Sequence, residues 1–175
     1  EGYRYVLAAL AEAIDRELYR SDLTDPQLRF NITKYRATAM PSSDARYLSA
    51  EIAGNGVYRL SGKLGNAPHI TGQAYGGVIA LESLDIKGVA DSNGNFEVTI
   101  GGPEGEPTTM RISPEASMLY FREYFSDWDT AIASKFILER IDRPSRGTPL
   151  QPATMAQVLE ATVGKMERQI PYWKG

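Results

Sequence analysis

The segment 118–125 carries the residues best suited to bind a small molecule. Successive side chains of a strand point to opposite faces, so Tyr120, Arg122 and Tyr124 share one face. We predict that the opposite face is fully apolar and is formed by Leu119, Phe121 and Phe125. A guanidinium between two phenols can hold a carboxylate or phosphate while the rings form an apolar wall. The alternative is an ordinary outer sheet face, along which long amphipathic side chains lie.

A second strand-like segment, 69–75, also separates into two faces. Its polar face consists of His69, Thr71, Gln73 and Tyr75. Its other face carries the small residues Gly72 and Ala74, which would let another part of the protein pack very close. His69 is the one histidine of the chain, so any imidazole acid–base step would have to use it. The alternative is a histidine that is merely solvent-exposed or hydrogen-bonded.

Two carboxylates lie on either side of an indole in Asp127-Trp128-Asp129, directly after the 118–125 segment. Nearby carboxylates suggest the acid and base of a glycosidase, or a site for a hard metal ion. The alternative is structural, because an aspartate in a turn commonly accepts backbone N–H groups of its own loop.

The residues Asp91, Asn93 and Asn95 have the spacing of the first three ligands in a calcium loop. The positions where such a loop needs glycine and glutamate hold Phe96 and Gly102 instead. The sequence therefore predicts a hairpin turn here, with Asn93 and Gly94 at the positive φ angles of a type I′ turn that joins two strands directly. We expect no metal and no cofactor.

Composition excludes several classes of protein. The chain has 175 residues, a net charge of −3, 42% hydrophobic and 23% charged residues, and no cysteine. This is the composition of a soluble globular protein, and no basic face suggests nucleic-acid binding. No run approaches the roughly 20 apolar residues of a membrane span. Without cysteine there are no disulfides, thiolate metal sites or cysteine nucleophile. The compartment is left open, with the cytoplasm favoured.

The hydrophobic pattern predicts a helix at each end of the chain and strands between them. Apolar residues recur at helical spacing over 3–19 and again over 152–169. Short strand-like runs separated by Gly, Pro, Asn and Asp cover 28–36, 46–53, 57–64, 69–75, 78–84, 96–100, 108–112, 118–125 and 135–142. The predicted fold is mainly β (α+β): a single domain over 1–175, an antiparallel jelly-roll-like β-sandwich flanked by the two helices.

Several short motifs resemble the amino-terminal half of bacterial proteins that carry domains of unknown function 1254 and 1214. The motifs are EGYRY at 1–5, VYRLSGKLGNA at 57–67, DSNGNFE at 91–97, FREYFSDW at 121–128 and ILERI at 137–141. The resemblance implies a jelly-roll-like sandwich without an agreed activity. It also implies a second β-rich half, so this chain is expected to be one half of a larger protein. The aromatic tail at 171–175 adds to that expectation.

These observations leave three function classes. The first is a module that binds a small, partly apolar or anionic ligand through Arg122, Tyr124, Tyr120, His69, Tyr75, Asp127 and Trp128. The second is a hydrolase or lyase acting on a small organic or sugar-like substrate through carboxylate, Arg and Tyr side chains. The third is a structural or oligomer-forming domain. We favour the binding module and leave open whether the chain is an enzyme and whether it forms a homo-oligomer.

Overall fold

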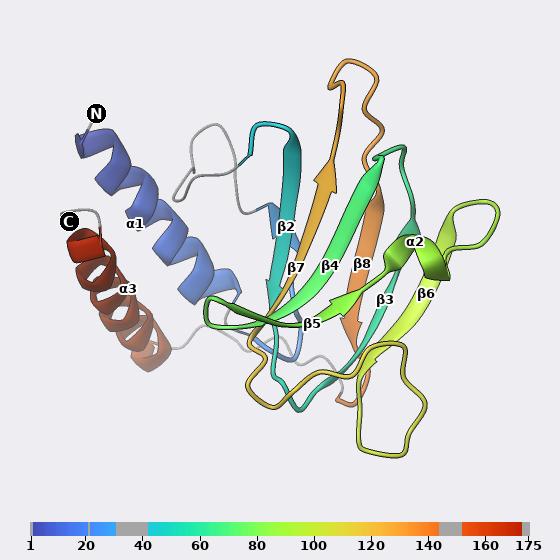
Figure 1. Cartoon of the computed structure of the whole chain (residues 1–175). Helices are drawn as coiled ribbons and strands as arrows, with labels where there is room; N and C mark the ends of the chain where they lie inside the picture. The colour runs from blue at the N-terminus through green and yellow to red at the C-terminus, as the bar shows by residue number, and fades with distance from the viewer. Residues whose placement is uncertain (1, 21, 31–41, 144–151, 173–175) are drawn as a thin grey trace.

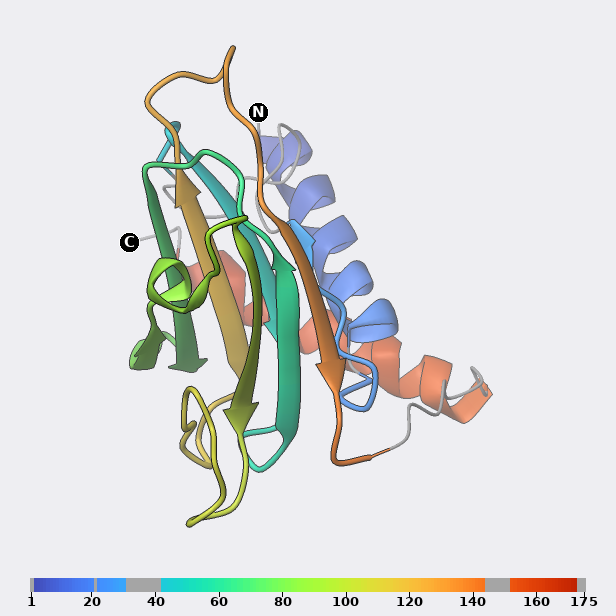
Figure 2. The same ribbon diagram turned by 90° about the vertical axis from the view of Figure 1, so that its right-hand side faces the viewer.

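Two antiparallel sheets packed face to face form the body of the computed structural model, which describes residues 2–20, 22–30, 42–143 and 152–172 (Figures 1 and 2). The larger sheet has the order β1 (Arg29–Phe30), β2 (Ala45–Glu51), β7 (Met118–Tyr124), β4 (His69–Gly76) and β5 (Ile79–Leu84). The smaller has the order β6 (Asn95–Gly101), β3 (Val57–Lys63) and β8 (Lys135–Arg140). This arrangement confirms the predicted antiparallel α+β class, whereas the jelly-roll detail stays a prediction.

The terminal helices α1 (Gly2–Tyr19) and α3 (Pro152–Tyr172) pack against each other beside the larger sheet, as Figure 1 shows. Both helices agree with the prediction. The short helix α2 (Ile86–Val89) was not predicted. It begins where the Asp85 carboxylate accepts the N–H of Gly88, and it buries Ile86. Within the described ranges, no helix has the length and apolar character needed to cross a membrane.

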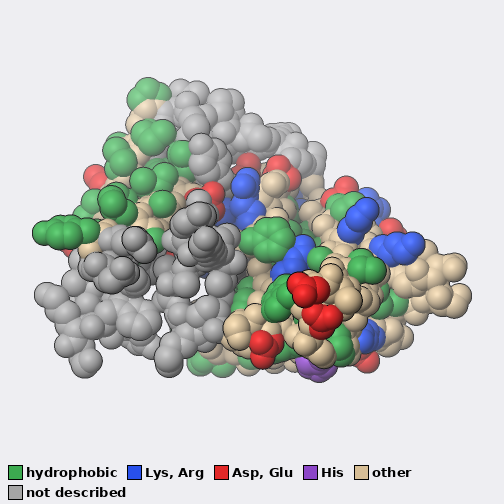
Figure 3. Space-filling view, turned by 90° about the horizontal axis from the view of Figure 1, so that it is seen from above, with side chains coloured by type: hydrophobic (Ala, Val, Ile, Leu, Met, Phe, Trp, Pro, Cys, Tyr) green, Lys and Arg blue, Asp and Glu red, His purple; other side chains and the backbone are tan. Residues whose placement is uncertain are grey.

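Two arginines, one in α1 and one directly after it, join the helix to the outer face of the larger sheet. Arg16 pairs with Glu51 of β2. Arg20 is buried and donates to both the carbonyl and the hydroxyl of Ser49, at 3.1 and 2.5 Å. Burial is the main cause that lowers the pKa of Arg20 below its ordinary value. Helix and sheet are thus joined here by polar side chains, and hydrophobic side chains gather at the exposed helical end of the molecule (Figure 3).

Two predicted strands differ from the structure. The 108–112 segment forms no strand, because it makes only an isolated parallel bridge between Met110 and Ile100, with backbone bonds from Thr109 and Met110 to Thr99. Strand β1 covers two residues of the predicted 28–36 run, and 31–36 lie outside the described residues. The tail at 173–175 also lies outside them.

The predicted type I′ turn at Asn93-Gly94 is wrong. Gly94 has φ +80°, but no described residue other than glycine has a positive φ. The Asp91 carboxylate accepts the N–H groups of Asn93 and Asn95, which holds the turn in an ordinary conformation with glycine alone in the left-handed region. The turn also follows α2 and leads into β6, so it does not join two strands directly.

Close packing on the inner face of the larger sheet depends on a small residue in β4. A Cβ at Gly72 would lie 3.1 Å from the Phe121 ring and 3.2 Å from the Ile86 side chain. Phe121 in turn stacks on Phe136 of β8 in the smaller sheet, with ring centroids 5.3 Å apart. The sequence predicted that the small residues of β4 let another part of the protein pack close. In the structure, the parts that pack close are the Phe121 ring of the neighbouring strand and Ile86 of α2.

The inner face of β7 is not fully apolar, contrary to the prediction, because Glu123 lies on it with no exposed surface. Arg46 Nη1 lies 2.5 Å from Glu123 Oε2 and 2.9 Å from the carbonyl oxygen of Ser134. The N–H of Ser134 donates to Glu123 Oε1 at 2.8 Å. Ser134 immediately precedes β8, so this buried carboxylate joins the two sheets at one end of the sandwich.

We predict that Glu123→Ala lowers the free energy of unfolding by about 3–5 kcal/mol, because it leaves the Arg46 guanidinium and a buried N–H without their partner. Urea denaturation measures the change. The matched control is Glu139→Ala, which removes an exposed ion pair with Arg59 and should cost less than about 1 kcal/mol. Equal losses in the two variants would contradict the role of Glu123.

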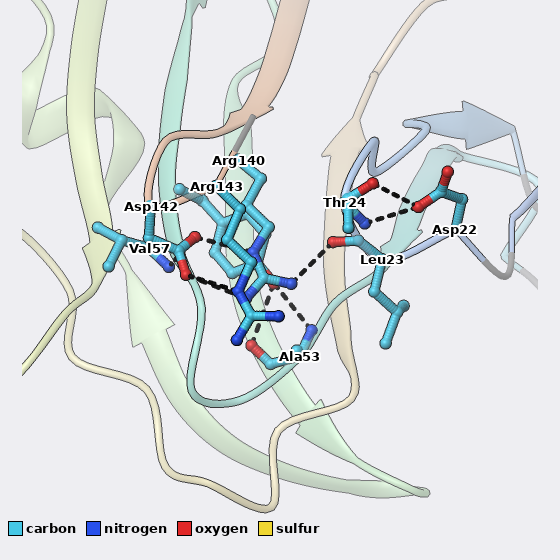
Figure 4. Close-up of polar contacts among 9 residues, drawn as sticks. Asp22, Leu23, Thr24, Ala53, Val57, Arg140, Asp142 and Arg143 are labelled. Carbon is cyan, nitrogen blue, oxygen red and sulfur yellow. Dashed lines mark hydrogen bonds and ion pairs between the residues drawn. The ribbon is translucent and has the colours of Figure 1, made fainter. Parts of the chain in front are cut away.

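A second polar cluster ties the segment after α1 to the end of the smaller sheet (Figure 4). Arg140 is buried and donates to both carboxylate oxygens of Asp142, at 2.8 and 3.0 Å. It also donates to the carbonyl of Leu23 at 3.0 Å, and Asp142 accepts the N–H of Val57 at 3.2 Å. The hydrogen bond from Arg140, followed by that from Val57, holds the pKa of Asp142 below its ordinary value.

This lowered pKa predicts a pH-dependent contribution to stability. A carboxyl group whose pKa is lowered on folding stabilises the fold above its ordinary pKa of about 3.9, and the contribution is lost as pH falls through the folded-state value. Asp142→Asn should therefore lower Tm at pH 7, and the difference from the parent should shrink below about pH 4. Calorimetry from pH 3 to pH 7 measures this.

The control is Asp129→Asn, an exposed carboxylate in the β7–β8 loop, which should leave the curve of Tm against pH nearly parallel to that of the parent. A Tm difference at Asp142→Asn that is constant across the pH range would contradict the assignment.

Candidate functional site

The antiparallel register of β2, β7 and β4 arranges side chains in rows on the outer face of the larger sheet. Arg122 of β7 lies between Tyr47 of β2 and Thr71 of β4. Neighbouring rows place Tyr120 beside Gln73 and Tyr124 beside His69. We call this surface the Arg122 face, and it comprises Tyr47, His69, Thr71, Gln73, Tyr75, Tyr120, Arg122 and Tyr124.

Hydrogen bonds hold the Arg122 guanidinium between two side chains of β4. Its Nη1 donates to Gln73 Oε1 at 2.5 Å, and its Nη2 donates to the Tyr75 hydroxyl at 3.0 Å. The Tyr75 hydroxyl in turn donates to Gln73 Oε1 at 3.1 Å. This closed triangle restricts the rotation of the guanidinium and fixes where its remaining N–H groups point.

Tyrosine rings surround the same guanidinium. Its central carbon lies 4.6 Å from the centroid of the Tyr120 ring and 5.8 Å from that of Tyr75, both within reach of a cation–π interaction. Tyr120 also contacts the Tyr47 ring, with centroids 6.0 Å apart. The cation therefore lies against an aromatic surface that spans three strands.

The charge of Arg122 has no carboxylate partner among the residues that the structure describes, although the side chain is half-buried. Other arginines of the described chain do have a carboxylate partner. The pairs are Arg16–Glu51, Arg46–Glu123, Arg59–Glu139 and Arg140–Asp142. Burial acts to lower the pKa of Arg122, but the hydrogen bond to Tyr75 and the nearby phenols raise it above its ordinary value overall. The guanidinium is therefore charged at any physiological pH.

His69 and Tyr124 lie together at one end of the Arg122 face. Their ring centroids are 5.5 Å apart, and His69 is exposed. No hydrogen bond within the described ranges joins His69 to a carboxylate that would orient it as a base. The structure thus brings both predicted residues to the face without arranging an acid–base pair.

Asp127 and Trp128 belong to the loop after β7. The Asp127 carboxylate accepts the N–H of Asp129 at 3.0 Å and the hydroxyl of Thr130 at 2.8 Å. The aspartate therefore stabilises its own turn, as the structural alternative for this segment predicted. The Trp128 ring packs on Phe125, with centroids 5.0 Å apart. None of the contacts among the described residues joins either side chain to Arg122, and their role in binding stays a prediction.

Three residues of the Arg122 face, Tyr47, Thr71 and Gln73, were not among the predicted ligand contacts. Gln73 lay on the predicted polar face of its strand, so period-2 alternation could have included it. Tyr47 lies in a segment far from β7 in sequence, and only the pairing of β2 with β7 brings it beside Arg122. Thr71, opposite Arg122 on β4, has a buried hydroxyl with no hydrogen-bond partner in the described part of the chain.

No group of three or more His, Asp or Glu side chains that could hold a metal ion occurs in the ranges that the structure describes. The carboxylate of Asp91 is occupied by backbone N–H groups of its own turn, and these bonds, with that from Asn95 first, lower its pKa. The carboxylates of Asp91 and Asp127 thus both accept hydrogen bonds from their own loops, as in the structural interpretation of the two segments.

The fold is similar to that in the crystal structure of an uncharacterised protein from Burkholderia cenocepacia. The TM-score is 0.85 at 21% sequence identity, and the match covers 97% of this chain and 49% of that chain. This chain thus spans about half the length of that protein, and at this identity the likeness shows the fold alone. No family model and no curated protein matches the sequence. The resemblance to domains of unknown function 1254 and 1214, with its second β-rich half, stays a prediction.

We predict that the protein needs no metal for stability. Treatment with EDTA should leave Tm unchanged, because the carboxylates of Asp91 and Asp127 already have partners within the chain. Thermal unfolding with and without the chelator measures this. A fall of several degrees that calcium or zinc restores would contradict the prediction.

Proposed function

We propose that this chain is a binding module that holds a small, partly apolar anion on the Arg122 face. One observation carries the proposal: Arg122 is a half-buried cation whose partners among the described residues are neutral, namely Gln73, Tyr75 and Tyr120. A partly buried charge is stabilised by an opposite charge, and a ligand carboxylate or phosphate would supply it.

The neighbours of Arg122 favour a ligand with an apolar body. The rings of Tyr120, Tyr75 and Tyr47 form a wall beside the cation, and such rings provide apolar area with few rotatable bonds. The Gln73–Tyr75 triangle already orients the guanidinium, so binding would require little further ordering of this side chain. An aromatic or cyclic carboxylate combines both features.

The enzymatic alternative, a hydrolase or lyase, has less support from the geometry. The carboxylate of Glu51 on the same sheet face pairs with Arg16, and both oxygens of Asp127 are used within its own loop. His69 has a ring neighbour in Tyr124 but no orienting carboxylate among the described contacts. The arrangement therefore favours binding over acid–base chemistry.

The test is calorimetric titration with benzoate and cyclohexanecarboxylate, with the neutral benzamide as the ligand control. We predict that Arg122→Ala and Arg122→Lys both weaken carboxylate binding by about 1.5–3 kcal/mol, on the order of ten- to a hundredfold. Lysine fails because it lacks the planar fork that makes two parallel hydrogen bonds to a carboxylate.

The protein control is Arg59→Ala, which removes an exposed guanidinium from the smaller sheet and should leave binding unchanged. Circular dichroism and urea denaturation establish that each variant folds. A parent that binds neither carboxylate, or Arg122 variants that bind like the parent, would refute the proposal.

A further inference from the structure

Large apolar side chains on α1 and α3 face solvent. Their exposed fractions run from 37% at Leu10 and Ile14 to 91% at Tyr3. The set comprises Tyr3, Val6, Leu7, Leu10 and Ile14 of α1 with Leu159 and Val163 of α3, and we call it the apolar helix face. Hydrophobic side chains are gathered at this helical end of the molecule in Figure 3. Monomeric proteins rarely expose so many large apolar residues on two adjacent elements.

Each helix leaves this face open because it buries a different line of residues. On α1 the buried residues are Ala9 and Ala13. The same line continues to buried Arg20 just beyond the helix, which donates a hydrogen bond to Ser49 of the larger sheet. On α3 the buried residues are Val158 and Thr162. Leu159 and Val163 directly follow these two, so they lie about 100° further around the helix. On each helix an apolar strip beside the buried line is therefore exposed to solvent.

We propose that the apolar helix face is the interface with a second copy of this chain. The exposed parts of its seven side chains amount to roughly 700 Å² per copy, close to the about 800 Å² per partner of a standard stable interface. In a two-fold dimer the same patch lies on both sides, so each copy both covers and is covered.

The spacing of the apolar residues fits a helical partner of the same kind. Leu7, Leu10 and Ile14 follow one another at three and four residues, and Leu159 and Val163 are four apart. Ridges with this spacing interdigitate with the grooves of helices that have a similar pattern. A second copy presents two such helices already packed together, so dimerisation would form a four-helix layer between two β-sandwiches.

The first experiment measures molar mass by light scattering at about 100 µM, a concentration above the Kd expected of an interface of this size. The parent chain should have twice its monomer mass of 19.3 kDa. Leu7→Glu and Leu159→Glu should each have the monomer mass at the same concentration, with a rise in Kd of at least about a hundredfold, because each places two charges in the interface.

The matched control is Ile137→Glu, which changes an isoleucine of similar exposure on the outer face of the smaller sheet. This variant should stay dimeric. A parent of monomer mass, or glutamate variants of α1 and α3 that remain dimeric, would overturn the proposal. A monomeric parent would indicate that a different partner, such as a further domain of a longer protein, covers the apolar helix face.

A second measurement does not depend on glutamate being tolerated. The chain has no cysteine, so Leu7→Cys introduces a single thiol per copy. At about 100 µM protein, its reaction with a maleimide should be at least about tenfold slower than that of the thiol in Ile137→Cys, because dimerisation buries the first site and not the second. A Leu7→Cys thiol that reacts as fast as the Ile137→Cys thiol would also overturn the proposal.

Discussion

The buried carboxylate of Glu123 sets the position of the central strand, and both faces of the larger sheet depend on that position. Glu123 is fully buried, accepts hydrogen bonds from Arg46 and Ser134, and thereby joins β7 to β2 and to the segment that enters β8. A shift of β7 by one residue would turn Glu123 to the outer face and bring Arg122 into the core. The same contacts that hold the sandwich together therefore also present Arg122 on the outside.

The two arginines beside β7 illustrate how the surroundings decide the role of one side-chain type. Arg46 is neutralised by Glu123 and lies over the Phe30 ring, so its position is structural. Arg122 lies on the opposite face with only neutral hydrogen-bond partners among the described residues and with Tyr120 beneath it. A buried ion pair is already satisfied, whereas a half-buried cation among phenols has capacity for an anion. This difference supports the proposal that an anion binds at the Arg122 face.

The helical layer is joined to the sandwich by polar contacts at one end. Arg16 and Arg20 bind Glu51 and Ser49, and α3 packs on α1 without a close approach to the sheet. Since these long side chains bridge the distance, the large apolar residues of α1 are not needed for docking and remain exposed. The same arrangement places Glu51 and Ser49, which lie next to the Arg122 face, under the end of α1. The Arg122 face and the helical layer therefore share one face of the larger sheet.

The sequence by itself determined what depends on local pattern. Period-2 alternation placed Tyr120, Arg122 and Tyr124 on one face of their strand, and helical spacing located both terminal helices, because these signals need only the chain's own geometry. Tertiary structure decided the rest. The burial of Glu123 could not be read from a strand in which a charged residue ordinarily faces water, and Tyr47 joins the Arg122 face only through the pairing of β2 with β7. The side of α1 that meets the sheet was likewise decided by Arg16 and Arg20, since two long polar side chains with partners on β2 outweighed the apolar stripe.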